Sequence, residues 1–131
     1  MTELSDQQRH AIRRSLEERF AELREEIRQV LLRYEDEQYL DLAGRVHDSE
    51  EQSVADLLVD LNLADIDRHV REMREIEAAL LRIRQGTYGL CVDCDNPIAV
   101  GRLEAYPTAK RCLPCQEAYE RDYRQEGHPS L

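Results

Sequence analysis

The chain has 131 residues, of which 35% are charged, one is Phe and none is Trp. So few large apolar side chains do not suit a compact core, and the composition is typical of long exposed helices rather than of a sheet sandwich. The net charge of −10 disfavours direct binding to DNA or RNA, because neutralising phosphates needs a basic patch. The basic clusters Arg13-Arg14 and Lys110-Arg111 both stand beside plentiful carboxylates.

The first predicted element is a long helix that begins near Ser5 and ends near Gly44. Ser5 and Gln8 have the spacing of a capping box, and Gly44 suits the left-handed position that follows a helix. Between them, apolar residues recur at steps of three and four, which predicts one buried stripe. The stripe consists of Ile12, Leu16, Phe20, Leu23, Ile27, Val30 or Leu31, and Tyr34.

A second long helix is predicted from about Gln52 to Gln85. Its stripe consists of Val54, Leu58, Leu61, Ile66, Val70, Met73, Ile76, Leu80 and Ile83. Two helices of similar length joined by a short turn pack most simply as an antiparallel hairpin. We therefore expect a mainly α fold in which residues 5–86 form a long helical hairpin, a coiled coil, with its tip near 44–53.

The remaining residues, 87–131, are predicted to form a small metal module. Gly86 ends the second helix, and further glycines and prolines then interrupt the helical pattern. After the last cysteine, residues 116–125 favour a short C-terminal helix.

Four cysteines in two Cys-x-x-Cys pairs predict one structural zinc ion. Cys91 and Cys94 are separated from Cys112 and Cys115 by seventeen residues, a spacing at which two zinc knuckles converge on one tetrahedral ion. Four sulfur ligands leave no open position for a catalytic water. An iron-sulfur cluster and a thiol redox switch remain the chemical alternatives.

No segment approaches the roughly eighteen consecutive apolar residues of a membrane helix, and the first residues lack the apolar core of a signal peptide. Paired cysteines in such a chain favour metal binding over disulfides. We therefore expect a cytoplasmic protein without membrane contact.

The segment around the cysteines closely resembles the DksA/TraR zinc-finger family. The matching residues are Gly86-Thr-Tyr-Gly-Leu-Cys-Val-Asp-Cys94, Arg102-Leu-Glu-Ala-Tyr-Pro-Thr108 and Cys112-Leu-Pro-Cys115. The helical hairpin expected upstream agrees with the family architecture over nearly the whole chain. The resemblance implies a coiled-coil finger that enters the secondary channel of bacterial RNA polymerase and acts on transcription without sequence-specific DNA contact.

The resemblance also places a partner-binding tip on residues 48–53. The family's tip pattern, Asp-x-x-Asp-x-Ala, meets Asp48 at its first position. Glu51 keeps the second negative charge on a longer side chain, and Ser53 replaces the alanine. The purely structural interpretation is that Asp48 and Glu51 form a capping box for the second helix. Capping and partner binding are compatible roles for the same residues.

Family members that respond to guanosine tetraphosphate use basic residues at positions that here hold Glu75, Tyr106 and Gln116. Arg68 and Arg71 remain nearby, but a phosphate-rich ligand has little reason to bind beside Glu75. We expect synergy with this nucleotide to be weak or absent, and no cofactor other than zinc.

Two functional hypotheses follow. The first is a polymerase-binding transcription regulator with an acidic tip. The second is a coiled-coil interaction module without a polymerase role, in which the zinc only stabilises one end of the protein. An enzyme is the least favoured class, because the sequence offers no nucleophile with a base, no open metal site and no phosphate loop.

Overall fold

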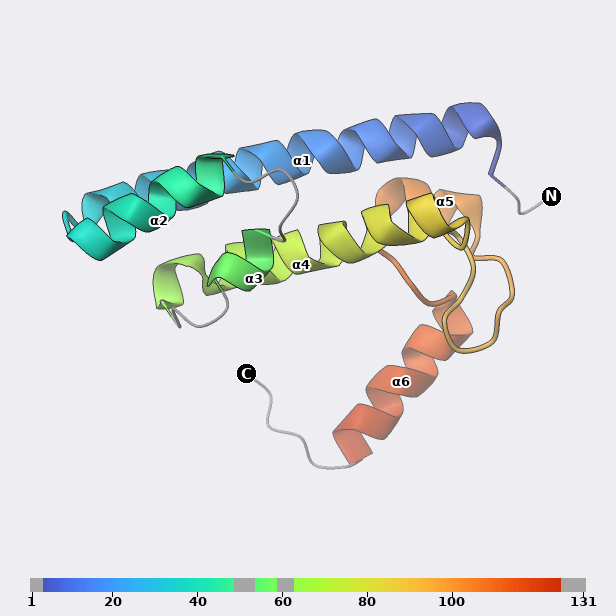
Figure 1. The fold of residues 1–131 in the computed structure, drawn as a ribbon. Coiled ribbons are helices and arrows are strands. Elements are labelled where there is room, and N and C mark those ends of the chain that lie inside the picture. The colour runs from blue at the N-terminus through green and yellow to red at the C-terminus, as the bar shows by residue number, and fades with distance from the viewer. Residues whose placement is uncertain (1–3, 49–53, 59–62, 126–131) are drawn as a thin grey trace.

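The computed structural model describes residues 4–48, 54–58 and 63–125, and over these residues the chain is mainly helical (Figure 1). Its helices are α1 (Asp6–Arg33), α2 (Glu37–Asp48), α3 (Val54–Leu58), α4 (Ala64–Gln85), α5 (Val100–Ala105) and α6 (Leu113–Gln125). This confirms the expected mainly α fold. None of the helices in the described part is long and apolar enough to cross a membrane.

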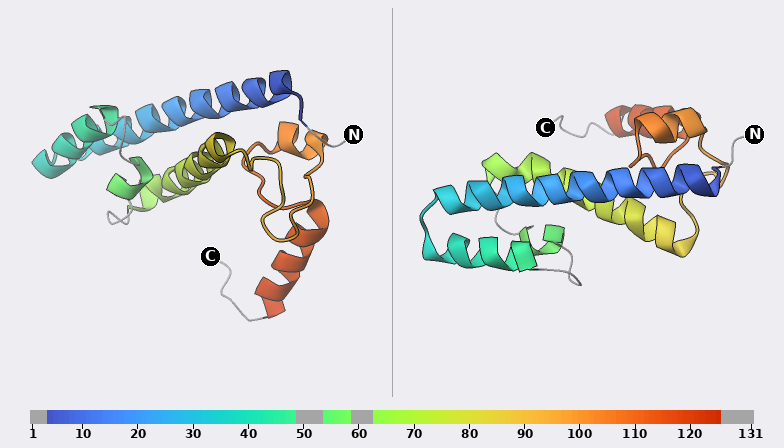
Figure 2. Two further views of the ribbon diagram at one scale, coloured as in Figure 1. Left: turned by 45° about the vertical axis from the view of Figure 1, so that its right-hand side comes forward. Right: turned by 90° about the horizontal axis from the view of Figure 1, so that it is seen from above.

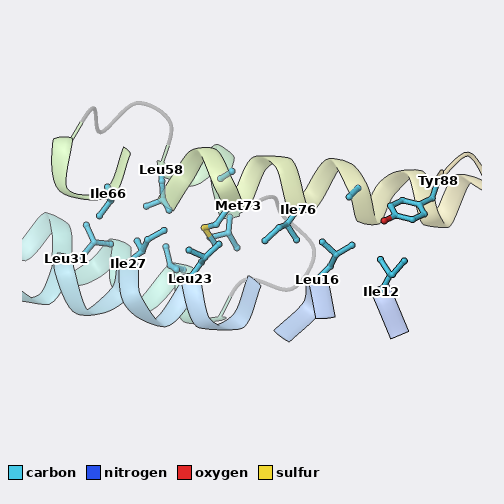
Figure 3. Packing of buried hydrophobic residues seen from close by; sticks show 14 of the residues in the cluster. Ile12, Leu16, Leu23, Ile27, Leu31, Leu58, Ile66, Met73, Ile76 and Tyr88 are labelled. Atoms are coloured by element: carbon cyan, nitrogen blue, oxygen red, sulfur yellow. The ribbon is translucent and has the colours of Figure 1, made fainter. Parts of the chain in front are cut away.

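The core lies between α1 and α4, which run in opposite directions, with α2 and α3 packed at one end (Figures 2 and 3). The first stripe buries Leu23, Ile27 and Leu31 completely, and Met73 and Ile76 meet them from α4. Burying a side chain of this size contributes about 1.5–3 kcal/mol. The apolar stripes therefore hold the two long helices together as expected.

Helix α1 begins with the predicted capping box. The Gln8 backbone N–H donates to Ser5 Oγ at 3.0 Å, and the Ser5 backbone N–H donates to Gln8 Oε1 at 2.9 Å. These reciprocal bonds satisfy donors that have no partner within the helix.

The expectation of one continuous first helix to Gly44 is wrong. Helix α1 ends at Arg33, and α2 folds back along it (Figure 1). Glu35 has a left-handed backbone, with φ of 53°, and the Asp36 carboxylate accepts the Gln38 backbone N–H at 2.8 Å, which opens α2. Gly44 therefore lies inside α2 and closes no helix.

The reversal is stabilised by burial. The second half of α2 places Leu42, Ala43 and Val46 in the core. These residues continue the helical periodicity of α1, so the same pattern suits either a straight helix or one folded back.

The second predicted helix is also divided. Its described part consists of α3 and α4, and α4 begins only at Ala64, while Leu61 lies outside the described residues. The Tyr34 hydroxyl donates to Asp65 Oδ2 at 3.0 Å and joins the end of α1 to the start of α4. The end of the helical arm farthest from the cysteines is thus formed by the α1–α2 turn and the start of α4 (Figure 1).

Helix α4 ends where the sequence predicts. Gly86 is left-handed, with φ of 78°, and the Thr87 backbone N–H donates to the Arg82 carbonyl at 2.9 Å. This termination turns the chain directly into the cysteine-bearing loops.

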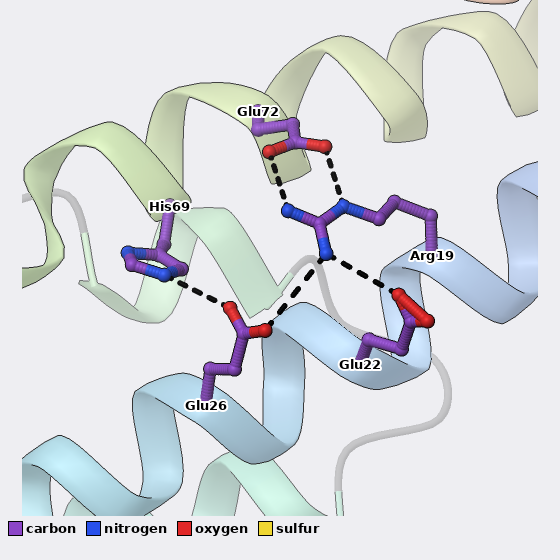
Figure 4. Close-up of polar contacts among 5 residues, drawn as sticks. All are labelled: Arg19, Glu22, Glu26, His69 and Glu72. Atoms are coloured by element: carbon purple, nitrogen blue, oxygen red, sulfur yellow. Dashed lines mark hydrogen bonds and ion pairs between the residues drawn. The ribbon is translucent and has the colours of Figure 1, made fainter.

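A polar cluster fastens α1 to α4 on the outside of the core (Figure 4). Arg19 donates to both carboxylate oxygens of Glu72, at 2.7 and 3.0 Å, and also to Glu22 at 3.2 Å. Glu26 lies 3.8 Å from Arg19 and 2.9 Å from His69 Nε2. Glu72 and His69 belong to α4, so the cluster bridges the two helices.

Replacing Glu72 by Gln is expected to lower stability only modestly. The hydrogen bond from Arg19 lowers the pKa of Glu72 below its usual value of 4.5, so its stabilisation is present above that value and lost as the pH falls through the lowered pKa. Because both side chains are about 40% exposed, we expect a loss of about 0.5–1 kcal/mol, or roughly 2–5 °C in Tm, near pH 7.

Thermal unfolding followed by circular dichroism measures this effect, with Glu17→Gln, an exposed residue of α1, as the control. The difference between Glu72→Gln and the unaltered protein should shrink as the pH falls through the lowered pKa of Glu72 and vanish at a pH low enough to protonate the carboxylate in both the folded and the unfolded state. A difference that persists there would show that the ion pair is not its cause.

Candidate zinc centre

The first cysteine pair lies on a loop, and the second lies at the start of α6, with Cys112 directly before the helix and Cys115 in its first turn. The Cys91 backbone N–H donates to the Asn96 carbonyl at 2.8 Å, and the Asp95 backbone N–H donates to the Cys91 carbonyl at 2.9 Å. The Val92 backbone N–H donates to the Lys110 carbonyl at 2.9 Å, which connects the loop of the first pair to that of the second. The first pair thus lies in a tight turn, and this turn is held beside the segment that leads into the second pair at the start of α6.

The four cysteine sulfurs all lie within 4.8 Å of one another, and no other metal-binding group of this kind occurs within the described residues. Cys94 Sγ and Cys112 Sγ are 3.8 Å apart. A disulfide would bring the sulfurs to about 2.05 Å, whereas four sulfurs at about 2.3 Å from a tetrahedral zinc lie about 3.8 Å from one another. The structure brings together all four residues that the sequence singles out, at a spacing that suits zinc.

The electrostatics of the sulfurs also fit a bound cation. Burial alone would raise the pKa of the Cys91 thiol, but hydrogen bonds from the backbone N–H groups of Cys112, Cys94 and Asp93 lower it to about 6. The thiols of Cys112, Cys91 and Cys94 raise the pKa of Cys115 well above its usual value. Four thiols this close together repel one another when several of them are deprotonated, and a bound divalent cation offsets that repulsion.

A small apolar core supports the cysteine loops from the α4 side. Tyr88, Ile98 and Leu103 are buried, and the Tyr88 hydroxyl donates to the Pro107 carbonyl at 2.8 Å. Burial raises the pKa of Tyr88 to about 12. Gly89 is left-handed, with φ of 89°, and a Cβ there would lie 3.5 Å from Leu103. Tyr88, Gly89 and Leu103, which belong to the segments that resemble the family, therefore stabilise the structure beside the metal site.

Arg102 and Arg111 connect the first cysteine loop to the segment that leads into the second cysteine pair, a role that no pattern in the sequence indicates. Arg102 Nε donates to the Arg111 carbonyl at 3.1 Å, and Arg111 Nε donates to Asp93 Oδ2 at 2.7 Å. The Arg111 guanidinium also lies 4.1 Å from the centre of the Tyr119 ring of α6. Because Asp93 lies between the first two cysteines, this chain of contacts joins the first loop to the second and to α6.

The predicted tip residues lie away from the cysteines. Asp48 is the last residue of α2, and the fold-back places it part-way along the arm rather than at its far end (Figures 1 and 2). Glu51 and Ser53 lie outside the described residues.

Glu75, Tyr106 and Gln116 all line one cleft of about 690 Å³ between α4 and the zinc module. Basic residues distant in sequence also line it, among them Arg74 and Lys110. This concentration of basic residues is not apparent in the sequence, because only the fold brings these residues to one place.

Comparisons with known proteins agree with this architecture. Residues 86–121 match the prokaryotic dksA/traR C4-type zinc finger. The RNA polymerase-binding transcription factor DksA of Caulobacter vibrioides is 36% identical over 93 residues, which are 71% of this chain and 61% of that protein. The Escherichia coli protein of the same name is 30% identical over 82% of this chain and 68% of its own. The chain thus spans less than two thirds of the length of the Caulobacter relative.

The fold is similar to that of transcription factor DksA2 from Pseudomonas aeruginosa. The TM-score is 0.59 and the sequence identity 27%, covering 95% of this chain and 89% of that one. The matched zinc finger and the convergence of four thiols together indicate one structural zinc ion. From its zinc finger and its relatives along the helical arm, the chain belongs to the DksA/TraR family.

Proposed function

We propose that this protein is a transcription regulator that binds bacterial RNA polymerase through the secondary channel, in the cytoplasm and without sequence-specific contact to DNA. The observation that supports this most strongly is similarity to relatives named for polymerase binding that extends beyond the zinc finger into the helical arm. The net charge of −10 also favours a protein partner over free nucleic acid.

In this proposal the zinc module is a rigid base. Cys91, Cys94, Cys112 and Cys115 are the four zinc ligands, and the ion fixes the zinc module, assigned to residues 87–131, at the end of the helical unit, residues 5–86. A closed four-sulfur site has no position for substrate, so the metal has a structural role in this proposal, and no residue is assigned a catalytic role.

The acidic tip is the proposed effector. Asp48 and Glu51 would bring carboxylates near the active centre of the polymerase, where they influence the catalytic magnesium ions or mobile elements, and Ser53 would complete the partner-binding tip. The family pattern at these positions supports this role. Extending the arm to present residues 48–53 at its end would require α2 to continue α1 rather than fold back along it.

Synergy with guanosine tetraphosphate is proposed to be weak or absent. Glu75, Tyr106 and Gln116 supply no positive charge at the positions where responsive family members have basic residues. Glu75 would also repel a polyphosphate.

Binding of the fluorescently labelled, zinc-loaded protein to RNA polymerase core enzyme tests the proposal. We expect saturable one-to-one binding with Kd on the order of micromolar or tighter, equivalent to about −8 kcal/mol. Absence of binding by protein that carries one zinc per chain would contradict the proposed function and would favour a generic coiled-coil interaction module.

A further inference from the structure

Helix α2 lies folded back along α1 (Figure 2), and the turn that reverses the chain is short. It consists of Tyr34, Glu35 and Asp36. Tyr34 still has a right-handed helical backbone, with φ of −73° and ψ of −17°. The Leu40 backbone N–H already donates to the Asp36 carbonyl at 2.9 Å, which starts α2. The reversal is thus centred on Glu35, whose backbone is left-handed with φ of 53°.

The sequence at this turn does not require a break in the helix. Residues 5–85 contain no proline and one glycine, Gly44, which lies inside α2. A left-handed backbone is unfavourable for a residue with a Cβ, and glutamate readily adopts a helix. Leu63, the residue before α4, also makes no side-chain hydrogen bond that would cap that helix. Apart from the Asp36 cap, the fold-back is therefore held by tertiary contacts and not by helix breakers.

Buried apolar side chains and a ring contact hold α2 in the folded-back position. The buried residues are Leu42, Ala43 and Val46. The ring of Tyr39 packs edge-on against that of Tyr34, with ring centres 5.1 Å apart. At the other end of α2, His47 lies beside Glu25 of α1. Hydrogen bonding to Arg28 lowers the pKa of the Glu25 carboxyl most, and the nearby charge of His47 lowers it further.

The buried face of α2 is also in register with α1. Leu42 and Val46 follow Leu31 by eleven and fifteen residues, close to three and four turns of 3.6 residues. If the helix ran straight through the turn, both would therefore lie on the side of α1 that buries Leu31. There they could meet the apolar side chains of α3, Val54 and Leu58. The same apolar face can thus be covered in a folded-back arm and in a straight one.

We propose that α2 is an autoinhibitory segment, which exchanges between this folded-back position and an extended position in which it continues α1. The inference rests on the proposed function, because the exchange hides or presents the tip. Folded back, Asp48 lies part-way along the arm. In the extended arm, helical residues 34–48 would carry it roughly 22 Å beyond the end of α1. Binding in the polymerase channel favours the extended form, because a ligand shifts an equilibrium toward the state that it binds better.

Two variants with the same change in charge shift this equilibrium in opposite directions. Glu35→Ala with Asp36→Ala, the alanine variant, removes the cap and places the best helix former in the turn. Glu35→Gly with Asp36→Asn, the glycine variant, relieves the left-handed position and keeps a capping residue. Spin labels on Ser15 and Arg45, both exposed, report the form of the arm by electron paramagnetic resonance. The labels are attached through non-natural amino acids, so the cysteines stay available for zinc.

The distance between the labels distinguishes the two forms. In one continuous helix, Ser15 and Arg45 are separated by roughly 45 Å. We expect this distance to dominate in the alanine variant and a clearly shorter one to dominate in the glycine variant. The unaltered protein should show mainly the shorter distance and shift to the longer one when core enzyme is added. The shorter distance in both free variants, or in the complex with core enzyme, would overturn the inference.

Binding to core enzyme tests the autoinhibitory role separately. The apparent Kd rises as the fraction of molecules in the binding-competent form falls, so the alanine variant should bind on the order of tenfold more tightly than the glycine variant. Equal binding by the two variants would overturn the inference and leave the proposed function intact. Failure of both variants and of the unaltered protein to bind would overturn the proposed function as well.

Discussion

Replacing Cys112 by serine is expected to release the zinc ion and to disorder the loops around the cysteines, while most of the helical arm remains folded. A hydroxyl is a poor substitute for a thiolate ligand, and a structural zinc of this type contributes on the order of 10 kcal/mol or more to the fold that it holds. The helices nearest the site, α5 and α6, have only 6 and 13 residues, whereas α1 and α4 have 28 and 22. Total helix content should therefore fall only partly.

Metal analysis and hydrogen exchange measured on the same sample test this prediction. The protection of backbone amides from hydrogen exchange should be lost in residues 87–125 and retained in the core of α1 and α4. Val92→Ser is the matched control, because Val92 is exposed in the first cysteine loop and offers no ligand of its own. Retention of one zinc per chain by Cys112→Ser would contradict the assignment of four sulfur ligands.

Asp48→Asn combined with Glu51→Gln is expected to abolish the effect on transcription and to leave polymerase binding within about twofold of normal. The substitutions remove two negative charges and keep side-chain size, so they isolate charge at the proposed tip. Asparagine also remains a good helix-capping residue, which separates an effector role from the capping interpretation. Transcription in vitro with purified polymerase measures the effect, and binding is determined in parallel.

The turn between α1 and α2 provides a demanding control. Glu35 and Asp36 form the turn between α1 and α2 at the far end of the arm, directly after Tyr34, whose hydroxyl donates to Asp65. Glu35→Gln with Asp36→Asn makes the same change in charge there, and the account predicts an almost unaltered effect on transcription. If this variant loses the effect and the Asp48 and Glu51 variant keeps it, the tip is at the α1–α2 turn and the assignment of residues 48–53 is wrong.

The parts of the fold with strong local signals were predictable from the sequence. Ser5 and Gln8 form the expected capping box, Gly86 ends α4, and Leu23, Ile27, Met73 and Ile76 are buried along the expected stripes. The spacing of the four cysteines alone predicts that they converge on one site.

The reversal at Glu35 gives no comparable signal. Left-handed turns are usually marked by Gly or Asn, and here the position holds Glu. Leu42 and Val46 keep the apolar spacing of the preceding helix, so the periodicity is the same whether α2 continues α1 or packs against it. The outcome depends on whether the apolar area buried by folding back stabilises the chain more than one continuous helix would. That balance depends on tertiary packing, which the local sequence does not reveal.

The basic cleft was unpredictable for another reason. Arg74, Arg82, Arg102 and Lys110 are scattered over α4 and the zinc module among many acidic residues, and each one alone is an ordinary surface cation in the sequence. Their concentration depends on how the module sits against α4, which includes the contact of Arg102 with the second cysteine loop.

The most direct test of the central claim is competition between this protein and Escherichia coli DksA for RNA polymerase core enzyme, with zinc content verified on the same sample. Binding through the secondary channel predicts that each protein displaces the other completely, with a displacement curve set by their two Kd values. Simultaneous binding of both proteins to one core enzyme, or no binding by the zinc-loaded protein, would contradict it.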